Sequence, residues 1–254
     1  MSRILAFEWR RAVSLRSTWG FLGLGMAMLV FIAWAAMIFD DVQEGAAPGA
    51  APSMEGVASF DGGGPLGILV LTTVCAQAFG HEYRDGTMRL VLSQFPQRAR
   101  VFLAKVAVPS AFVTASILVA LGLSLAGAAL LFDVTPQQGW GEVAAIGLRQ
   151  VGLGLWWGLI VVGVTALLRN LAAGIIVSLV FALILENLAI GLLVRVDPAT
   201  GEELSRAPLL TENLPFTNAL EWAAEGGTRA ATVAVIWAAG VLGLACVLFI
   251  RRDA

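Results

Sequence analysis

The chain has 254 residues, of which 58% are hydrophobic and only 13% are charged. Its mean hydropathy is +0.83, and a soluble globular domain carries roughly twice this share of charged residues. The composition therefore excludes an ordinary water-soluble fold. The length suits a single membrane domain, because each crossing of a bilayer takes about 20 apolar residues. The formal net charge is −2, and we expect no nucleic-acid partner.

Six long apolar stretches predict six spanning helices, at residues 19–39, 66–80, 101–132, 143–168, 171–194 and 230–250. The second stretch is short, so we expect its helix to begin in the turn at 62–65 and to continue through His81 and Glu82. The third is long and contains Pro109, which we expect to bend or locally unwind it. These stretches predict an all-α integral membrane protein with a single transmembrane domain, residues 1–254.

The charged residues are distributed unequally between the connections. By this layout twelve of the sixteen basic residues lie on one side of the membrane, and thirteen of the eighteen acidic residues lie on the other. Lys and Arg in short loops mark the cytoplasmic side. We therefore expect both termini in the cytoplasm and an external loop at residues 195–229.

Residues 1–18 are typical of an amphipathic helix. One face carries Leu5, Ala6, Trp9, Ala12 and Val13, and the other carries Arg3, Arg10, Arg11 and Ser14. Such a basic amphipathic helix lies along the inner membrane surface. It is either a plain anchor or an anchor that also has a coupling role.

The connection between the second and third spans contains a second short amphipathic helix. Asp85, Gly86 and Thr87 predict a turn and a helix cap, and Pro96 ends the segment. Between them, apolar residues recur at helical spacing: Met88, Val91, Leu92 and Phe95. We expect this apolar face to lie on lipid or to fit a groove on a partner protein.

The same connection resembles the membrane subunits of type-2 ABC exporters. The similarity consists of Glu82, a basic position, Gly86-Thr87, an apolar run ending in Pro96, and then Arg98 and Lys105. The N-terminal EWRRAVSLRSTWGFL is similar to the entry helix of these permeases, and ENLPFTNALEWA is similar to their external segment. The chain is accordingly identified as an ABC-2 permease subunit.

The resemblance implies that residues 86–96 form a coupling helix that docks on a separate cytoplasmic ATPase. The residues implied in coupling are Glu82, Arg84, Gly86, Thr87, Met88, Val91, Leu92, Phe95 and Arg98. It also implies two ATPase copies and two permease copies, as a homodimer or a heterodimer, with the second and fifth spans lining the route. ATP and Mg would be bound by the partner.

This chain itself has no phosphate-binding loop, because its only lysine, Lys105, follows Ala104 instead of the Gly that the loop requires. We therefore expect it to have no catalytic residue and no cofactor of its own. Cys75 and Cys246 lie in apolar runs, and the sequence predicts neither a disulfide nor a metal site.

Polar residues inside the spans are candidates for the substrate path: Thr72, Thr73, Gln77, Glu186 and Asn187. A carboxylate within a span is costly and by default marks function, yet packing or dimer contact is the favoured alternative for Glu186. Gly154 and Gly158 have the spacing that lets helices approach closely.

The residues that the chain contains restrict the other possible functions. A zinc protease is excluded because His81 is the only histidine. A proton-coupled secondary transporter that uses Glu186, and a membrane partner that does not transport, stay as alternatives. The favoured interpretation is an exporter of a hydrophobic or amphipathic antibiotic, peptide or lipid. Because fifteen of the sixteen basic residues are Arg, we expect a bacterial source and a location in the cytoplasmic membrane.

Overall fold

The structure is a computed structural model that describes residues 1–39, 53–60, 64–196, 203–205 and 207–251. Within these residues, six helical segments are long and apolar enough to cross a membrane: Arg16–Ala35, Met54–Arg84, Arg98–Leu131, Trp140–Leu168, Leu171–Leu193 and Thr228–Arg251. The predicted all-α membrane fold with six spanning helices is confirmed.

The helices and strands fall into two halves along the chain. The first half contains α1 (Ser2–Ser14), α2 (Arg16–Phe39), α3 (Met54–Ser59), α4 (Gly64–Arg84), α5 (Met88–Gln94) and α6 (Arg98–Leu131). The second half contains α7 (Trp140–Leu168), α8 (Leu171–Val180), the π-helical turn η2 (Phe181–Leu185), α9 (Glu186–Leu193), β1 (Val194–Val196), β2 (Glu203–Ser205), α10 (Pro208–Thr211), α11 (Pro215–Glu225) and α12 (Thr228–Arg251).

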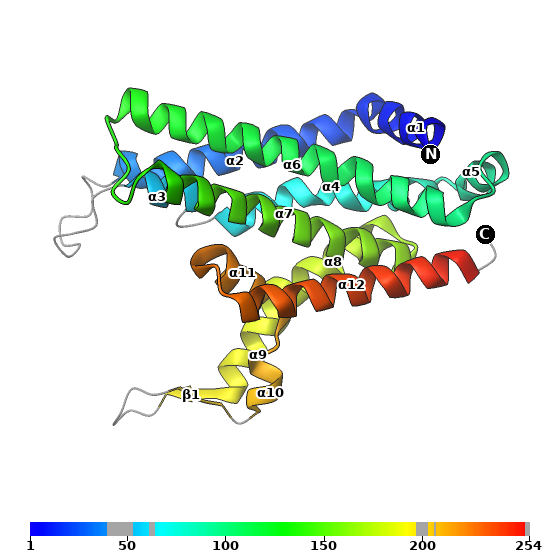
Figure 1. Ribbon diagram of the computed structural model, residues 1–254. Helices are drawn as coiled ribbons and strands as arrows, with labels where there is room; N and C mark the ends of the chain where they lie inside the picture. The colour runs from blue at the N-terminus through cyan, green and yellow to red at the C-terminus, as the bar shows by residue number, and fades with distance from the viewer. Residues whose placement is uncertain (40–52, 61–63, 197–202, 206, 252–254) are drawn as a thin grey trace.

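Helix α4 occupies the centre of the bundle, where it packs against α2, α6, α7 and α8 (Figure 1). Small residues make this possible. A Cβ at Gly67 would lie 2.6 Å from Leu29 Cδ2 of α2, and a Cβ at Gly158 of α7 would lie 2.9 Å from Cys75 Sγ of α4. Gly154 is in equally close contact with Ile117 of α6. The predicted close approach at Gly154 and Gly158 thus occurs between helices of one chain.

The fifth span leaves the bundle. Figure 1 shows α8 and α9 slanting away from the other spanning helices and ending at the β1–β2 hairpin. Its most apolar stretch is 17% buried, whereas the corresponding stretch around α4 is 75% buried. The strands pair antiparallel, with Arg195 opposite Leu204. Helix α11 returns the chain to the bundle and packs on α7 and α12.

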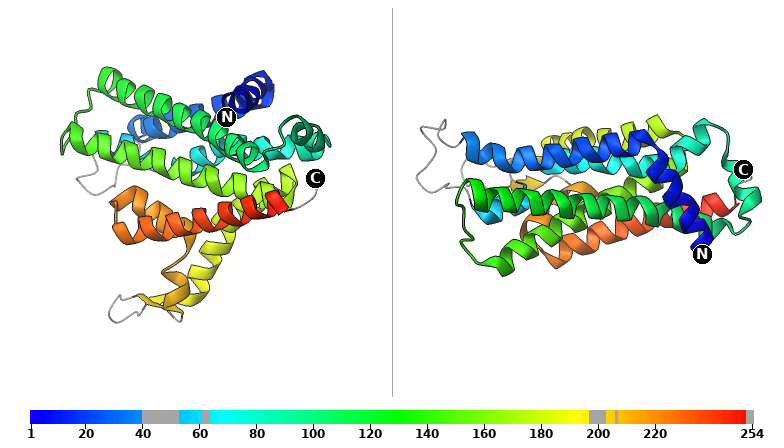
Figure 2. Two further views of the ribbon diagram at one scale, coloured as in Figure 1. Left: turned by 45° about the vertical axis from the view of Figure 1, so that its right-hand side comes forward. Right: turned by 90° about the horizontal axis from the view of Figure 1, so that it is seen from above.

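The N-terminus, α5 and the end of α12 lie at the same end of the bundle (Figures 1 and 2). Seen from above, α1 crosses the helices at this end instead of continuing along α2 (Figure 2). The chain turns at Leu15, whose backbone is extended. We call this end, comprising α1, α5 and the adjoining ends of α4, α6, α7 and α12, the terminal face.

The helices extend beyond the apolar stretches from which they were predicted, because the first and last turns of a spanning helix contain polar residues. Four spans begin two or three residues earlier than predicted, at Arg16, Arg98, Trp140 and Thr228. Helix α4 begins at Gly64 and continues through Glu82 to Arg84, as expected. The expected unwinding at Pro109 is wrong, because α6 is continuous through this residue.

Candidate functional site at the terminal face

A buried lysine joins three helices at the terminal face. Lys105 of α6 is 0% exposed. Its Nζ lies 2.8 Å from Glu8 Oε1 of α1 and 2.5 Å from Glu82 Oε1 of α4. The same ammonium donates a hydrogen bond to the Ala78 carbonyl oxygen at 3.1 Å. A buried charge is tolerated only when it is paired and hydrogen-bonded, and Lys105 meets both conditions.

Arg11 completes this cluster from α1. Its guanidinium pairs with Glu82 and lies 3.2 Å from Glu8 Oε2. It also donates to the carbonyl oxygens of Gln77 and Ala78, at 3.0 and 2.9 Å. Two carboxylates and two cations therefore balance one another. We call Glu8, Arg11, Glu82 and Lys105 the charge network; it connects α1, α4 and α6.

The burial of α1 differs from the prediction. Arg11 was expected on the solvent-facing side, but Ile4, Glu8 and Arg11 form the side that packs against α4 and α6, with Ile4 and Glu8 buried. Trp9 is half exposed and stacks on Phe112 of α6, with ring centroids 4.6 Å apart. Arg11 lies on this side because Glu82 and two carbonyl oxygens of α4 are its partners, and without Arg11 the buried carboxylates would lose one of their two cations.

Helix α5 packs its apolar side onto its own chain. Met88 and Val91 are each 6% exposed, and Leu92 and Phe95 pack against the same core. The expectation that this side lies open to lipid or a partner is therefore wrong. The open side carries Leu90, which is 61% exposed. The turn before α5 contains Gly86 with φ 68°, a left-handed conformation that glycine adopts without strain.

An aromatic contact links α5 to α1. The rings of Phe7 and Phe95 lie 5.7 Å apart. Through this pair, α5 contacts the same helix that supplies Glu8 and Arg11. The four elements α1, α4, α5 and α6 thus form one connected unit at the terminal face.

The other predicted coupling residues lie at the edges of this unit. Arg84 is exposed and donates to Asp85 Oδ1 at 3.0 Å, a hydrogen bond that lowers the pKa of the Asp85 carboxyl. Thr87 stands at the N-cap position of α5, but its side chain makes no capping hydrogen bond. Arg98 donates to the Ile250 carbonyl oxygen of α12 at 3.2 Å.

The polar candidates on α4 are engaged inside the chain. Thr72 is fully buried and donates to the Leu69 carbonyl oxygen at 3.0 Å, and the half-buried Thr73 donates to the Val70 carbonyl oxygen at 2.6 Å. The buried Gln77 accepts hydrogen bonds from the hydroxyls of Ser17 and Thr18, each at 3.2 Å. Neither Thr72 nor Gln77 faces open space in this structure.

Glu186 binds the start of α11. Its carboxylate accepts hydrogen bonds from the backbone N–H groups of Phe216 and Thr217 and from the Thr217 hydroxyl, all at 2.9 Å. The first N–H groups of a helix have no partner within the helix, and a carboxylate there also opposes the positive end of the helix dipole. Asn187 is exposed and donates to the Leu183 carbonyl oxygen at 3.1 Å. This geometry favours the packing interpretation of Glu186.

Glu8 and Lys105 were not among the predicted site residues. Two signals mark them in the sequence. Glu8 is the only acidic residue before Asp40, in a segment otherwise rich in Arg, and Lys105 is flanked by apolar residues on both sides. Opposite charges in such surroundings indicate partners for each other.

Comparison with known proteins supports the resemblance. The family model described as ABC-2 family transporter protein matches residues 15–187, more than half of the chain. The match includes Glu82, α5, Lys105 and Glu186, and begins just after α1. No curated protein matches the chain. The chain belongs to the ABC-2 family of membrane transporter proteins.

Proposed function

We propose that this chain is the permease subunit of an ATP-driven exporter in a bacterial cytoplasmic membrane, with both termini in the cytoplasm. A separate ATPase subunit, which binds ATP and Mg, docks on the terminal face. Two permease copies and two ATPase copies form the complex, and the cargo is a hydrophobic or amphipathic antibiotic, peptide or lipid. The connected unit of α1, α4, α5 and α6 is the observation that carries this proposal.

The docking surface on α5 is the side opposite its buried residues. Leu90 is the exposed apolar side chain of this helix. Gly86 and Thr87 precede it on the exposed turn, and Ser93 and Gln94 follow it. Met88 and Val91 serve coupling from inside, because they hold α5 to the bundle.

Motion of the ATPase would reach the spanning helices by two routes. One runs through Met88 and Val91 into the core beside α4 and α6. The other runs from Phe95 to Phe7 of α1, and from there through the charge network. Packed side chains and paired charges resist separate movement of the elements that they join. A displacement of α5 therefore moves α1, α4 and α6 together.

The test replaces Leu90 in the assembled complex. The permease is co-expressed with its ATPase, purified and reconstituted in lipid vesicles. We expect Leu90→Asp to lower both the amount of ATPase retained and the ATP-driven transport by about tenfold, since it removes an apolar contact and buries a charge at the interface. The matched control is Leu209→Asp, in the exposed helix α10.

Normal ATPase retention and normal transport in Leu90→Asp would contradict docking on α5. The same experiment addresses the alternatives. A proton-coupled transporter that uses Glu186, or a membrane partner that does not transport, predicts no ATP-dependent flux for any variant. The three hydrogen bonds on the Glu186 carboxylate give no support to a proton-carrying role.

A further inference from the structure

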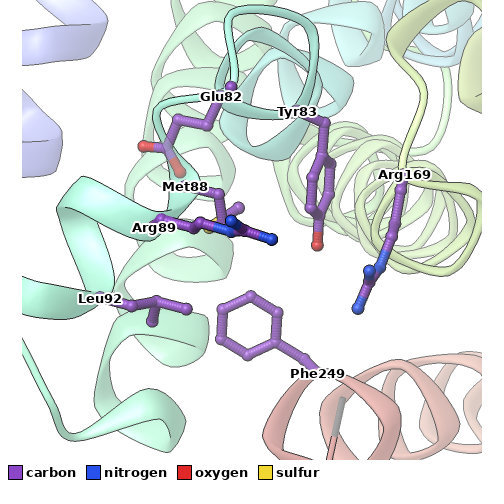
Figure 3. A pocket seen from close by; sticks show the side chains of 8 residues that line it. Glu82, Tyr83, Met88, Arg89, Leu92, Arg169 and Phe249 are labelled. Carbon is purple, nitrogen blue, oxygen red and sulfur yellow. The ribbon is translucent and has the colours of Figure 1, made fainter. Parts of the chain in front are cut away.

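A small cavity opens at the terminal face between α4, α5, the end of α7 and the end of α12. Its volume is about 160 Å³. The side chains that matter for its chemistry are Tyr83, Met88, Arg89, Leu92, Arg169 and Phe249. Figure 3 shows Arg89 and Arg169 approaching the cavity from opposite sides, with the Tyr83 hydroxyl between them and the Phe249 ring below.

The charges of Arg89 and Arg169 are not compensated by any described residue. Neither guanidinium forms an ion pair or a hydrogen bond within the described chain; Arg169 only approaches the face of the Tyr83 ring, at 5.9 Å. Glu82 also lines the cavity, but its carboxylate is engaged by Lys105 and Arg11 and points away from Arg169 (Figure 3). Among the described residues, two positive charges therefore face one cavity, and no carboxylate pairs with either of them.

The backbone conformation of Arg169 is a second, independent indication that this position has a function. Arg169 ends α7 in the left-handed conformation, with φ 53° and ψ 28°. Glycine or asparagine normally occupies such a position after a helix, since a larger side chain is strained there. Strained residues of this kind concentrate at functional sites. In this conformation the guanidinium of Arg169 lies beside Tyr83, at the edge of the cavity.

We propose that this cavity binds the phosphate group of an anionic phospholipid. Arginine matches phosphate oxygens with paired N–H donors. Met88, Leu92 and Phe249 add apolar side chains to the lining between the two guanidinium groups, so the ligand is amphipathic instead of a free ion. The cavity lies where the spanning helices α4, α7 and α12 end, at Arg84, Leu168 and Arg251. Basic pockets between spanning helices at this depth hold anionic headgroups.

The test compares two sets of variants in vesicles of equal parts phosphatidylglycerol and phosphatidylcholine. Lipids that stay bound after extraction are counted by native mass spectrometry. The cavity variant is Arg89→Gln with Arg169→Asn, because asparagine tolerates the left-handed backbone. The matched control is Arg16→Gln with Arg100→Gln, which removes two exposed charges from the same face but outside the cavity.

We expect the cavity variant to retain about tenfold less phosphatidylglycerol than the unaltered chain, because it loses charge-assisted hydrogen bonds. The control variant should retain as much phosphatidylglycerol as the unaltered chain. Arg89→Lys with Arg169→Lys keeps the charge but not the paired donors, and should bind to an intermediate extent. An equal loss of phosphatidylglycerol from the control variant, or equal retention of this lipid by all variants, would overturn the proposal.

A second arm distinguishes lipid from soluble phosphate. The unaltered chain in pure phosphatidylcholine vesicles is titrated with inorganic phosphate and followed by phosphorus NMR, before and after phosphatidylglycerol is added. Displacement of any bound phosphate by phosphatidylglycerol supports the proposal. Saturable phosphate binding that depends on Arg89 and Arg169, and that phosphatidylglycerol does not displace, would overturn the lipid as the ligand.

Discussion

Lys105 Nζ lies 2.8 Å from Glu8 Oε1, so the start of α6 is tied to α1 by an ion pair inside the protein. Both residues are almost fully buried, at 0% and 3% exposed. A buried pair contributes little net stability when it is intact, but removing one member leaves an unpaired charge in a medium that solvates it poorly. This asymmetry makes the charge network sensitive to single substitutions.

Lys105→Met is expected to lower the free energy of unfolding by about 3–5 kcal/mol, because it leaves two buried carboxylates, Glu8 and Glu82, with only one of their two shared cations. Methionine has a similar length and keeps the space filled. The measurement is denaturant-induced unfolding in detergent micelles, followed by tryptophan fluorescence. Arg84→Gln is the control, since its ion pair with Asp85 is exposed and should have almost no effect.

The double variant Glu8→Gln with Lys105→Met tests whether the two residues act on each other. We expect it to be more stable than the sum of the single effects predicts, by about 0.5–3 kcal/mol, because each single change removes the same pair. Strictly additive effects would show that Glu8 and Lys105 are independent.

The two sides of α5 should respond differently to truncation. Met88→Ala is expected to lower the free energy of unfolding by about 2–3 kcal/mol, because it leaves a void under the helix. Leu90→Ala on the exposed side should change it by less than about 0.5 kcal/mol. Equal destabilisation by the two variants, measured by the same unfolding assay, would show that α5 does not pack as described.

The spans were predictable from the sequence because every helix that crosses a bilayer needs about 20 mainly apolar residues, whatever it packs against. The site was only partly predictable. The stripe Met88, Val91, Leu92 and Phe95 has the same spacing whether a helix faces lipid, a partner or its own bundle, so the sequence could not assign its surroundings. Their burial depends on contacts with residues far away in the chain, such as Phe7.

Glu8 shows the same limit for charged residues. An amphipathic pattern assigns faces by polarity, and by that rule a carboxylate on α1 belongs on the solvent side. Its burial depends on its ion pairs with Arg11 and with Lys105, which lies nearly a hundred positions later, and on the packing of α1 on α6. A single charge in an unusual setting signals that a partner exists, but not which one.

Glu186→Gln should loosen the start of α11. An amide offers one acceptor oxygen, and its NH₂ group would oppose one of the backbone donors that the carboxylate now satisfies. We expect amide hydrogen exchange at Phe216 and Thr217 to accelerate by about tenfold or more, since an unsatisfied buried donor costs about 1–3 kcal/mol. Asn187→Ala, on the exposed side of α9, is the control and should leave exchange unchanged.

Unchanged exchange in Glu186→Gln would show that the carboxylate does not hold α11. A fall in ATP-driven transport without any change in exchange would instead return Glu186 to the substrate path. The two readouts together therefore distinguish packing from a direct role in transport.

The contact between α7 and α8 depends on Gly174. A Cβ at this position would lie 2.8 Å from Thr165 Cβ and 2.9 Å from Thr165 Cα. These atoms belong to or adjoin the backbone and cannot turn aside as the end of a long side chain can. Gly174→Ala should therefore push α8 away from α7 and lower the free energy of unfolding by about 1–3 kcal/mol.

Gly122→Ala provides the matched comparison. Gly122 lies in α6 with no atom within 4 Å of the added Cβ, so alanine there should raise stability by about 0.5–1 kcal/mol through its higher helix propensity. The two Gly→Ala substitutions should therefore change the free energy of unfolding in opposite directions in the same assay, because only Gly174 is in close contact with another helix. A stabilising Gly174→Ala would mean that α8 does not approach α7 this closely, and that the fifth span separates from the bundle nearer to its start than Gly174.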